Sequence, residues 1–185
     1  ERANVALSHE GAGMNLKALG LAFAFALAGG AAQADVKASA PDGLIIQIKT
    51  EVALDRDAAW ARLLDVASWW NGSHTYSGNA QSMSIDAVAG GCWCELWSGG
   101  EVEHGRVVFV MPKEAIRLSS ALGPLQEMGV SGALTFTLSD GSSPAKTAIT
   151  VDFKVSGSSL SGLDKLAPII DSVIAEQITR YASAK

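Results

Sequence analysis

The sequence predicts an α+β fold in which a curved antiparallel sheet of about six or seven strands wraps round a long C-terminal helix. The middle of the chain holds a series of short segments with alternating apolar and polar residues, separated by tight-turn residues. Helical spacing is found before this series and again at the end of the chain. Strands grouped together and followed by a helix are typical of α+β domains. With 185 residues, 48% of them hydrophobic, we expect one core and one domain.

The first strand and the first helices are predicted within the segment 44–70. A short polar lead-in, 35–43, precedes residues 44–52, which pass from an apolar run into alternation, as expected of a strand half covered by core. From Asp55 to Trp70 the apolar residues follow helical spacing, and Asp55 or Asp57 can cap the start. We therefore expect one helix or two short helices after the first strand.

The further strands are predicted in one continuous region with explicit turns between them. Turn sequences such as Ser98-Gly99-Gly100 and Ser139-Asp140-Gly141 make neighbouring strands antiparallel hairpins. Apolar and polar residues alternate most clearly in the last two strands, so one face of the sheet should be buried. The predicted strands are 83–88, 92–97, 102–111, 115–120, 133–138 and 147–155, of which the first two are also consistent with one strand bent at Gly90-Gly91.

The last element is predicted as an amphipathic helix over 163–184. Its polar residues, such as Asp171, Glu176 and Arg180, lie away from the apolar stripe. Because Pro168 is tolerated only in the first turn, we expect the regular helix from about Pro168, after a bend or a short lead-in helix. The stripe consists of Leu166, Ile170, Val173, Ile174, Gln177, Ile178 and Tyr181.

The N-terminal segment has the pattern of a secretory signal. A short positive region, 14–17, precedes an uninterrupted apolar run, 18–28, and Ala32-Gln33-Ala34 matches a cleavage site. We expect residues 14–34 to be a signal peptide and 1–13 an upstream extension before the initiator methionine. The mature domain, 35–185, is then periplasmic or secreted, with no stable membrane span. A core helix or an uncleaved anchor is the alternative, but the segment has no polar face.

Charge and motifs exclude several classes of function. The chain carries 14 basic and 19 acidic residues, a net charge of −5, which argues against nucleic acid or an anionic membrane as a partner. Its sequence contains no Walker loop, dinucleotide fingerprint, nucleophile elbow or HExxH motif. The common nucleotide-binding, hydrolase and zinc-protease interpretations are therefore disfavoured.

Several short stretches, taken in order, resemble the START-like or helix-grip (SRPBCC) superfamily, in particular its polyketide-cyclase/dehydrase and heat-shock-ATPase-activator branch. The resemblance covers about 44–184, which makes 35–185 a START-like domain. It implies a cavity between sheet and helix that binds a hydrophobic small molecule, no cofactor, and in some members cyclisation or dehydration. No catalytic motif is shared across the superfamily, so no mechanism follows. The matching stretches are Thr50-Glu51-Val52, residues 57–64, Trp69-Trp70, residues 90–95, residues 104–108 and the closing helix.

The hairpin around Ser98-Gly99-Gly100 has two possible registers. A two-residue loop would shift the pairing and put Glu95 opposite His104. We favour a three-residue loop because it also groups Leu96 with Val102, and we expect His104 to point inward with Glu103 solvated. The favoured register pairs Trp97 with Glu101, Cys94 with His104, and Cys92 with Arg106.

Cys92 and Cys94 are the only cysteines, and three interpretations of them stay open. Alternate residues of a strand lie about 6.5 Å apart, at the far edge of disulfide geometry, so we expect no ordinary disulfide. Buried thiols are the simplest interpretation. A strained redox-active bridge is the second, and metal ligation together with His74 and His104 is the third. We expect no metal, because the family does not generally carry one.

The candidate ligand-binding residues are placed by the resemblance. The loop that carries Trp70, His74 and Tyr76 lines the cavity mouth in helix-grip folds; alternatively, its tryptophans only plug the opening of the sheet. The segment 123–129 is either a lid over the cavity or a long hairpin connection. The complete predicted set is Trp70, His74, Tyr76, Cys94, His104 and Gln126.

Three functions follow as hypotheses. The first is an exported carrier that holds a hydrophobic or aromatic small molecule. The second is a cyclase or dehydratase that uses His104 or His74 as acid and base. The third is a metal or redox site at Cys92 and Cys94. Ligand identity and oligomeric state depend on cavity shape and surface contacts, which sequence patterns do not encode.

Overall fold

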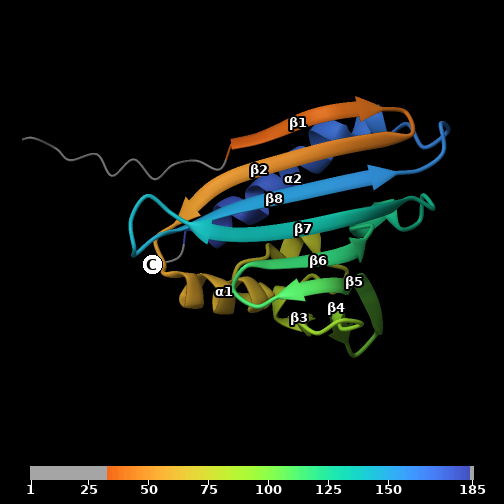
Figure 1. Ribbon diagram of the computed structural model, residues 1–185. Helices are drawn as coiled ribbons and strands as arrows, with labels where there is room; N and C mark the ends of the chain where they lie inside the picture. Colours follow the sequence, from red (N-terminus) through yellow and green to blue (C-terminus); the bar gives the residue numbers. More distant parts are fainter. Residues whose placement is uncertain (1–32, 184–185) are drawn as a thin grey trace, which may run out of the picture.

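The computed structural model describes residues 33–183 as a single antiparallel sheet with one long helix behind it (Figure 1). The strand order is β1-β2-β8-β7-β6-β5-β4-β3, so consecutive strands pair throughout except β2 and β3, and β8 pairs with both β2 and β7. This confirms the predicted α+β class. The strands are β1 (Gln33–Ala40), β2 (Gly43–Val52), β3 (Met83–Ile85), β4 (Cys92–Trp97), β5 (Gly100–Met111), β6 (Ala115–Ser120), β7 (Ser131–Asp140) and β8 (Thr147–Ser156).

The sheet has eight strands, more than the six or seven expected, partly because the predicted lead-in is a strand. β1 pairs antiparallel with β2, from Gln33 opposite Lys49 to Ala40 opposite Gly43. As an edge strand it is mostly exposed: among residues 35–40 Val36 alone packs against the core, so the strand lacks the alternation that identifies one. The predicted cleavage point after Ala34 lies inside β1, and residues 1–32 of the predicted N-terminal segments lie outside the described residues.

The segment 83–97 forms a hairpin of two strands, so the alternative of one bent strand is wrong. β3 and β4 are antiparallel neighbours, with Met83 opposite Glu95. Gly90 has a φ of 87°, and a Cβ on Gly91 would lie 2.1 Å from the Asp86 carbonyl oxygen. Only glycine fits this close approach. The two glycines thus allow the tight turn by which the chain reverses between β3 and β4.

The helical segment after β2 is broken, which confirms the alternative of short helices. Asp55 caps α1 (Arg56–Leu64) by accepting a hydrogen bond of 2.9 Å from the Ala58 N–H. A single turn, η1 (Val66–Ser68), follows. Three more 3₁₀ turns are η2 (Gly72–His74), η3 (Ala80–Ser82) and η4 (Gly123–Leu125).

The C-terminal helix α2 (Leu163–Ala182) is one continuous helix. The expected start near Pro168 is wrong, because the regular helix already begins at Leu163. Pro168 lies on the exposed side, where water can bond the carbonyl that it leaves without a helical partner. In residues 33–183 no helix combines the length and apolar character needed to cross a bilayer.

α2 packs on the inner face of the sheet against β1 and β2, and it appears behind these strands in Figure 1. Large buried side chains fill the interior near its C-terminal end, including Trp69, Trp93 and Tyr181. The Tyr181 hydroxyl donates to the Ala59 carbonyl at 2.9 Å, and Arg62 donates to the Tyr181 carbonyl at 2.9 Å. A cleft lies further along α2, beside residues 166–174.

Candidate functional site

A cleft of about 600 Å³ lies between α2, the connection from β6 to β7, and the loop that contains η2. This loop, residues 70–77, is called the η2 loop below. The floor of the cleft includes Phe153 of β8. Pockets of this volume are the usual size of small-molecule sites. It is lined by Trp70, Ser73, His74, Thr75, Tyr76, Leu122, Gly123, Pro124, Leu125, Glu127, Met128, Phe153, Leu166, Ile169, Ile170, Val173 and Ile174.

The cleft has an apolar wall and a polar edge. α2 contributes only aliphatic side chains, and the β6–β7 connection adds further apolar residues such as Met128. The η2 loop contributes hydroxyl groups, an imidazole and a phenol. Among the lining residues of the described chain there is no lysine or arginine, and Glu127 is the one carboxylate. The arrangement suits a mainly apolar guest with a hydrogen-bonding end better than an anion.

The η2 loop is held in place by hydrogen bonds with its own backbone and with α2. Asn71 caps η2 by accepting a bond of 3.0 Å from the Ser73 N–H. The Asn71 N–H donates to Gln177 Oε1 of α2 at 2.7 Å. The Trp70 indole N–H donates to the His74 carbonyl at 3.0 Å. These bonds fix the loop that presents His74 and Tyr76 to the cleft.

Glu95 supports the same loop from the sheet. Its carboxylate is fully buried and accepts three hydrogen bonds. The donors are the Tyr76 N–H at 3.0 Å, the Ser77 N–H at 2.5 Å and His104 Nε2 at 3.0 Å. A buried carboxylate needs such partners, because desolvation without them is costly. Glu95 is therefore the anchor of the polar edge of the cleft.

The Glu95–His104 pair is a carboxylate with a neutral imidazole. Burial raises the pKa of Glu95, but the hydrogen bonds from Ser77, Tyr76 and His104 outweigh it and hold the pKa below its usual range. Burial lowers the pKa of His104, and the attraction of Glu95 only partly offsets this. The neutral imidazole then donates its Nε2–H to the Glu95 carboxylate.

A β-bulge at His104 creates this pair and corrects the favoured hairpin register. The loop has two residues, so Trp97 pairs with Gly100 and Cys94 with Glu103, in place of Glu101 and His104. The register shifts between Trp93 and Cys94, which leaves His104 as an extra residue on β5. Cys92 therefore still pairs with Arg106, as predicted. His104 is only 3% exposed and Glu103 is exposed, as predicted for both.

A row of aromatic rings runs from the end of α2 to the cleft. Tyr181 contacts Trp69, Trp69 contacts Trp70, and Trp70 contacts Trp93, with ring centroids 5.0–5.7 Å apart in edge-to-face geometry. His104 continues the row, 6.0 Å from both Trp93 and Tyr76. Such pairs stabilise each other beyond simple burial. The polar edge of the cleft therefore packs against a continuous row of buried aromatic rings.

His74 forms a second histidine–carboxylate pair at the edge of the cleft. Its Nε2 lies 3.1 Å from Oε2 of Glu176 on α2, and Asn71 donates to the other carboxylate oxygen at 2.5 Å. The bond from Asn71 is the main reason that the pKa of Glu176 lies below its usual value. Both members of this pair are partly exposed, unlike Glu95 and His104.

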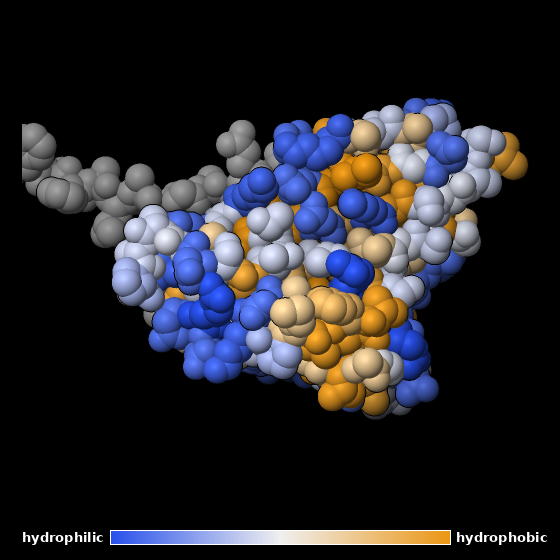
Figure 2. Space-filling model, in the orientation of Figure 1, coloured by the Kyte–Doolittle hydropathy of each residue, from blue (hydrophilic) through white to orange (hydrophobic). Residues whose placement is uncertain are grey.

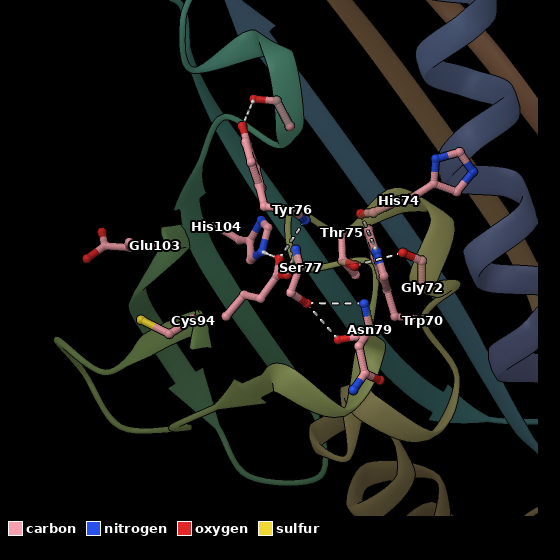
Figure 3. A network of polar contacts seen from close by, with 12 residues as sticks. Trp70, Gly72, His74, Thr75, Tyr76, Ser77, Asn79, Cys94, Glu103 and His104 are labelled. Carbon is pink, nitrogen blue, oxygen red and sulfur yellow. Dashed lines mark hydrogen bonds and ion pairs between the residues drawn. The ribbon is translucent and has the colours of Figure 1, made fainter. Parts of the chain in front are cut away.

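Cys92 and Cys94 are joined in a disulfide, which corrects the expectation that no ordinary bond would form. Their Cα atoms are 5.3 Å apart, within the range of disulfides, and the pairing of β4 with β5 shifts register between Trp93 and Cys94. Cys94 also points away from the cleft, together with Glu103 (Figure 3). No group of three or more metal-binding side chains occurs in residues 33–183.

Gln126 lies outside the cleft, in the β6–β7 connection. Its side-chain amide donates to the Glu103 carbonyl of β5 at 2.7 Å. In the same connection, the Gly123 carbonyl accepts a bond of 3.1 Å from the Tyr76 hydroxyl. The segment 122–128 is thus tied to β5 and to the η2 loop, and it forms one wall of the cleft.

The structure brings together three of the six predicted site residues, Trp70, His74 and Tyr76. His104 stands behind Tyr76, while Cys94 and Gln126 face elsewhere. Sequence reasoning missed Glu95 as the anchor and assigned the aliphatic residues of α2 to core packing. One signal was present: Ile169 lies outside the predicted stripe and is 63% exposed, so the apolar face of α2 is wider than packing requires.

Comparison with known proteins identifies the fold alone. No protein-family model matches the chain, and no curated protein is significantly similar to it in sequence. Solved structures are similar at low identity. Protein Ms6760 from Mycobacterium smegmatis matches with a TM-score of 0.54 and 14% identity, over 83% of this chain and 97% of its own.

Two further structures illustrate the range of the likeness. The Aha1 dimer from Colwellia psychrerythraea has a TM-score of 0.52 and 15% identity, over 76% of this chain and 94% of its own. A conserved protein of unknown function, EF2215 from Enterococcus faecalis, has a TM-score of 0.53 and 9% identity, over 82% and 74% of the two chains. The shared feature is a helix-grip type of α+β fold.

Proposed function

We propose that this protein is an exported carrier that holds an uncharged hydrophobic or aromatic small molecule in the cleft beside α2. The observation that carries the proposal is the cleft itself, about 600 Å³ in volume, with an aliphatic wall and a single polar edge. A few polar groups in an apolar pocket are typical of small-molecule sites, where they fix the orientation of the ligand.

The chemistry of the edge supports an uncharged ligand. His74 and Tyr76 supply the hydrogen-bonding groups, and the lining within the described chain offers no cation for a carboxylate or phosphate. The predicted relation to the polyketide-cyclase and heat-shock-ATPase-activator branch supports the same class of ligand. That relation is part of the proposal.

Export is part of the proposal as well. The predicted signal peptide, 14–34, supports it, and so does the Cys92–Cys94 disulfide, because disulfides persist in oxidising compartments. N-terminal sequencing of the protein from its own host tests the processing. We expect the mature chain to begin at Asp35, and an intact segment 14–34 on the purified protein would contradict export by cleavage.

Binding is tested with the neutral fluorescent probe N-phenyl-1-naphthylamine. Val173 lines the cleft, so Val173→Trp should fill part of it and weaken probe binding by about tenfold or more. Thr179→Trp is the matched control, because Thr179 is exposed on α2 and outside the lining. Equal affinity in both variants, or no saturable binding to the native protein, would rule out the carrier.

An enzyme of the cyclase or dehydratase type is the second candidate, and the His74–Glu176 pair favours it. A histidine oriented by a carboxylate is a common general base, and His74 lines the cleft. His104 is less suited, because it is buried and does not line the cleft. The test is turnover of apolar β-hydroxy carbonyl compounds, followed by the absorbance of the enone. His74→Ala should lower it by about a hundredfold or more, and Ser172→Ala, on the exposed side of α2, should not.

A further inference from the structure

The outer face of the β4–β5 hairpin carries the Cys92–Cys94 disulfide, which ligand binding in the cleft does not use. The bond spans a single intervening residue, Trp93. A cross-link over so short a stretch constrains the unfolded chain very little, and so contributes little to folding stability. A structural role therefore explains this disulfide poorly.

The two sulfur atoms have different electrostatic neighbours. Arg106 is the cross-strand partner of Cys92, and Glu103 is that of Cys94. Directly opposed side chains have Cβ atoms about 4.5–5.5 Å apart. Arg106 and Glu103 form an ion pair with each other, and Arg106 also donates to the Gly90 carbonyl at 2.9 Å. When the disulfide is open, the guanidinium favours a thiolate at Cys92, and the carboxylate opposes one at Cys94.

The disulfide lies on an accessible part of the molecule. Both cysteines are partly exposed, and they alternate with Trp93 and Glu95, which point inward. Figure 2 shows this outer face, where hydrophobic residues gather over β4 and β5. Leu96 and Val108 in these strands are each 54% exposed. A thiol in solution can therefore approach the sulfur atoms without any rearrangement of the fold.

We propose that Cys92 and Cys94 form a thiol–disulfide exchange site that oxidises thiols in the compartment of the protein. A substrate thiolate attacks the sulfur of Cys94, the bond between the cysteines breaks, and Cys92 leaves as the thiolate beside Arg106. A second substrate thiolate then attacks the substrate sulfur of the mixed disulfide and displaces Cys94. The products are a substrate disulfide and the Cys92/Cys94 dithiol, which has gained two electrons and, on protonation, the two substrate protons.

An external disulfide of the glutathione class restores the bond between the cysteines by a separate route. The Cys92 thiolate attacks it and releases one thiol, and Cys94, as thiolate, then attacks the Cys92 sulfur of the mixed disulfide and displaces the second thiol. Stabilisation of the Cys92 thiolate beside Arg106 makes Cys92 the better leaving group on reduction and the more populated nucleophile on re-oxidation. The site takes thiols as its substrate class, carried by a small molecule or by a polypeptide.

Equilibration with glutathione tests the proposal on the full chain, purified without reductant. After incubation in mixtures of reduced and oxidised glutathione, the protein is quenched in acid and alkylated, and alkylated thiols are counted by mass. We expect none at the start and a single transition to two within the glutathione range. Two alkylated thiols at the start, or none in the most reducing mixture, would overturn the proposal.

Two substrate arms identify the source of the thiol. One follows oxidation of reduced glutathione by the protein, and the other follows oxidation of a reduced, unfolded polypeptide with two cysteines. Faster reaction per thiol in one arm assigns that source and supports the proposal. No reaction in either arm overturns it.

The asymmetry between the sulfur atoms is tested with single-cysteine variants and oxidised glutathione. Cys94→Ser, which keeps Cys92, should form the mixed disulfide about tenfold faster than Cys92→Ser. Adding Arg106→Gln to Cys94→Ser should slow it by about three- to tenfold, whereas adding Arg117→Gln, at an exposed position of β6, should not. Equal rates in both single variants would contradict the assigned roles. Probe binding in the cleft is measured on the same variants, so failure of the carrier proposal is seen separately.

Discussion

On the inner face of the β4–β5 hairpin, Glu95 and His104 are almost fully buried, whereas Glu103 and Arg106 on the outer face of the same strands are exposed. Each face carries a carboxylate paired with a basic side chain. Glu95 of the inner pair also accepts hydrogen bonds from the Tyr76 and Ser77 N–H groups of the η2 loop, while the outer pair faces solvent. Surface ion pairs contribute little to stability, and buried ones are costly to break.

The comparison shows that burial and backbone contacts decide the role of each pair. Glu95 holds the loop that shapes the cleft, so its loss should unfold or deform the site. The outer face carries the Cys92–Cys94 bond beside Glu103 and Arg106, where a change should alter reactivity more than stability. Four predictions sharpen this contrast, from the largest expected effect to the smallest.

Glu95→Ala should give the largest loss of stability. It leaves the Tyr76 and Ser77 N–H groups and the His104 imidazole without their acceptor, which should lower the free energy of unfolding by about 3–5 kcal/mol. Urea denaturation measures the change. Glu101→Ala, at an exposed position of the same hairpin, is the control and should stay within about 0.5 kcal/mol. A similar small loss for Glu95→Ala would show that the buried carboxylate is no anchor.

Acidification should lower the free energy of unfolding in two steps. Their total should be smaller than the loss caused by Glu95→Ala. The folded pKa of His104 lies below its ordinary 6.5, so the unfolded chain binds that proton first, and stability falls as the pH drops below about 6.5. The folded pKa of Glu95 lies below 4.5, so the second loss begins there. Urea denaturation at several pH values measures both. His104→Gln should remove the first step, and His74→Gln, at the exposed pair, should retain it.

Loss of the disulfide should have a smaller effect. Cys92→Ser/Cys94→Ser should lower the free energy of unfolding by about 1.5 kcal/mol or less, because the closed ring is so short. The native protein measured with and without reductant provides the comparison and should show a similar difference. A loss as large as that of Glu95→Ala would mean that the two faces of the hairpin do not differ in the way described.

Gly162→Ala, at a position outside the β4–β5 hairpin, should give the smallest loss of stability. Gly162 precedes α2 with a φ of 62°, and a Cβ there would meet no atom within 4 Å. The cost is therefore conformational only, about 1 kcal/mol. Gly162→Asn is the matched control, since asparagine tolerates this conformation, and it should cost less. Thermal unfolding of both variants measures the difference, and equal costs would exclude backbone strain as the cause.

Local patterns were sufficient to predict most of the strands. β4 and β6 begin and end where alternation and turn residues place them, and Asp55 caps α1 as expected. β1 was missed because an exposed edge strand has no buried face to generate alternation. The start of α2 was placed too late because the proline rule does not account for an exposed position.

The sequence by itself determined the α+β class, the antiparallel hairpins and the loop that carries Trp70, His74 and Tyr76, because these depend on residue periodicity and turn chemistry over short distances. Only the tertiary structure decided which side chains meet. One extra residue at His104 turned its imidazole toward Glu95 and placed Cys94 on the opposite face. Strand periodicity cannot anticipate a bulge, because a bulge is set by cross-strand packing and interrupts the very alternation from which a face is assigned.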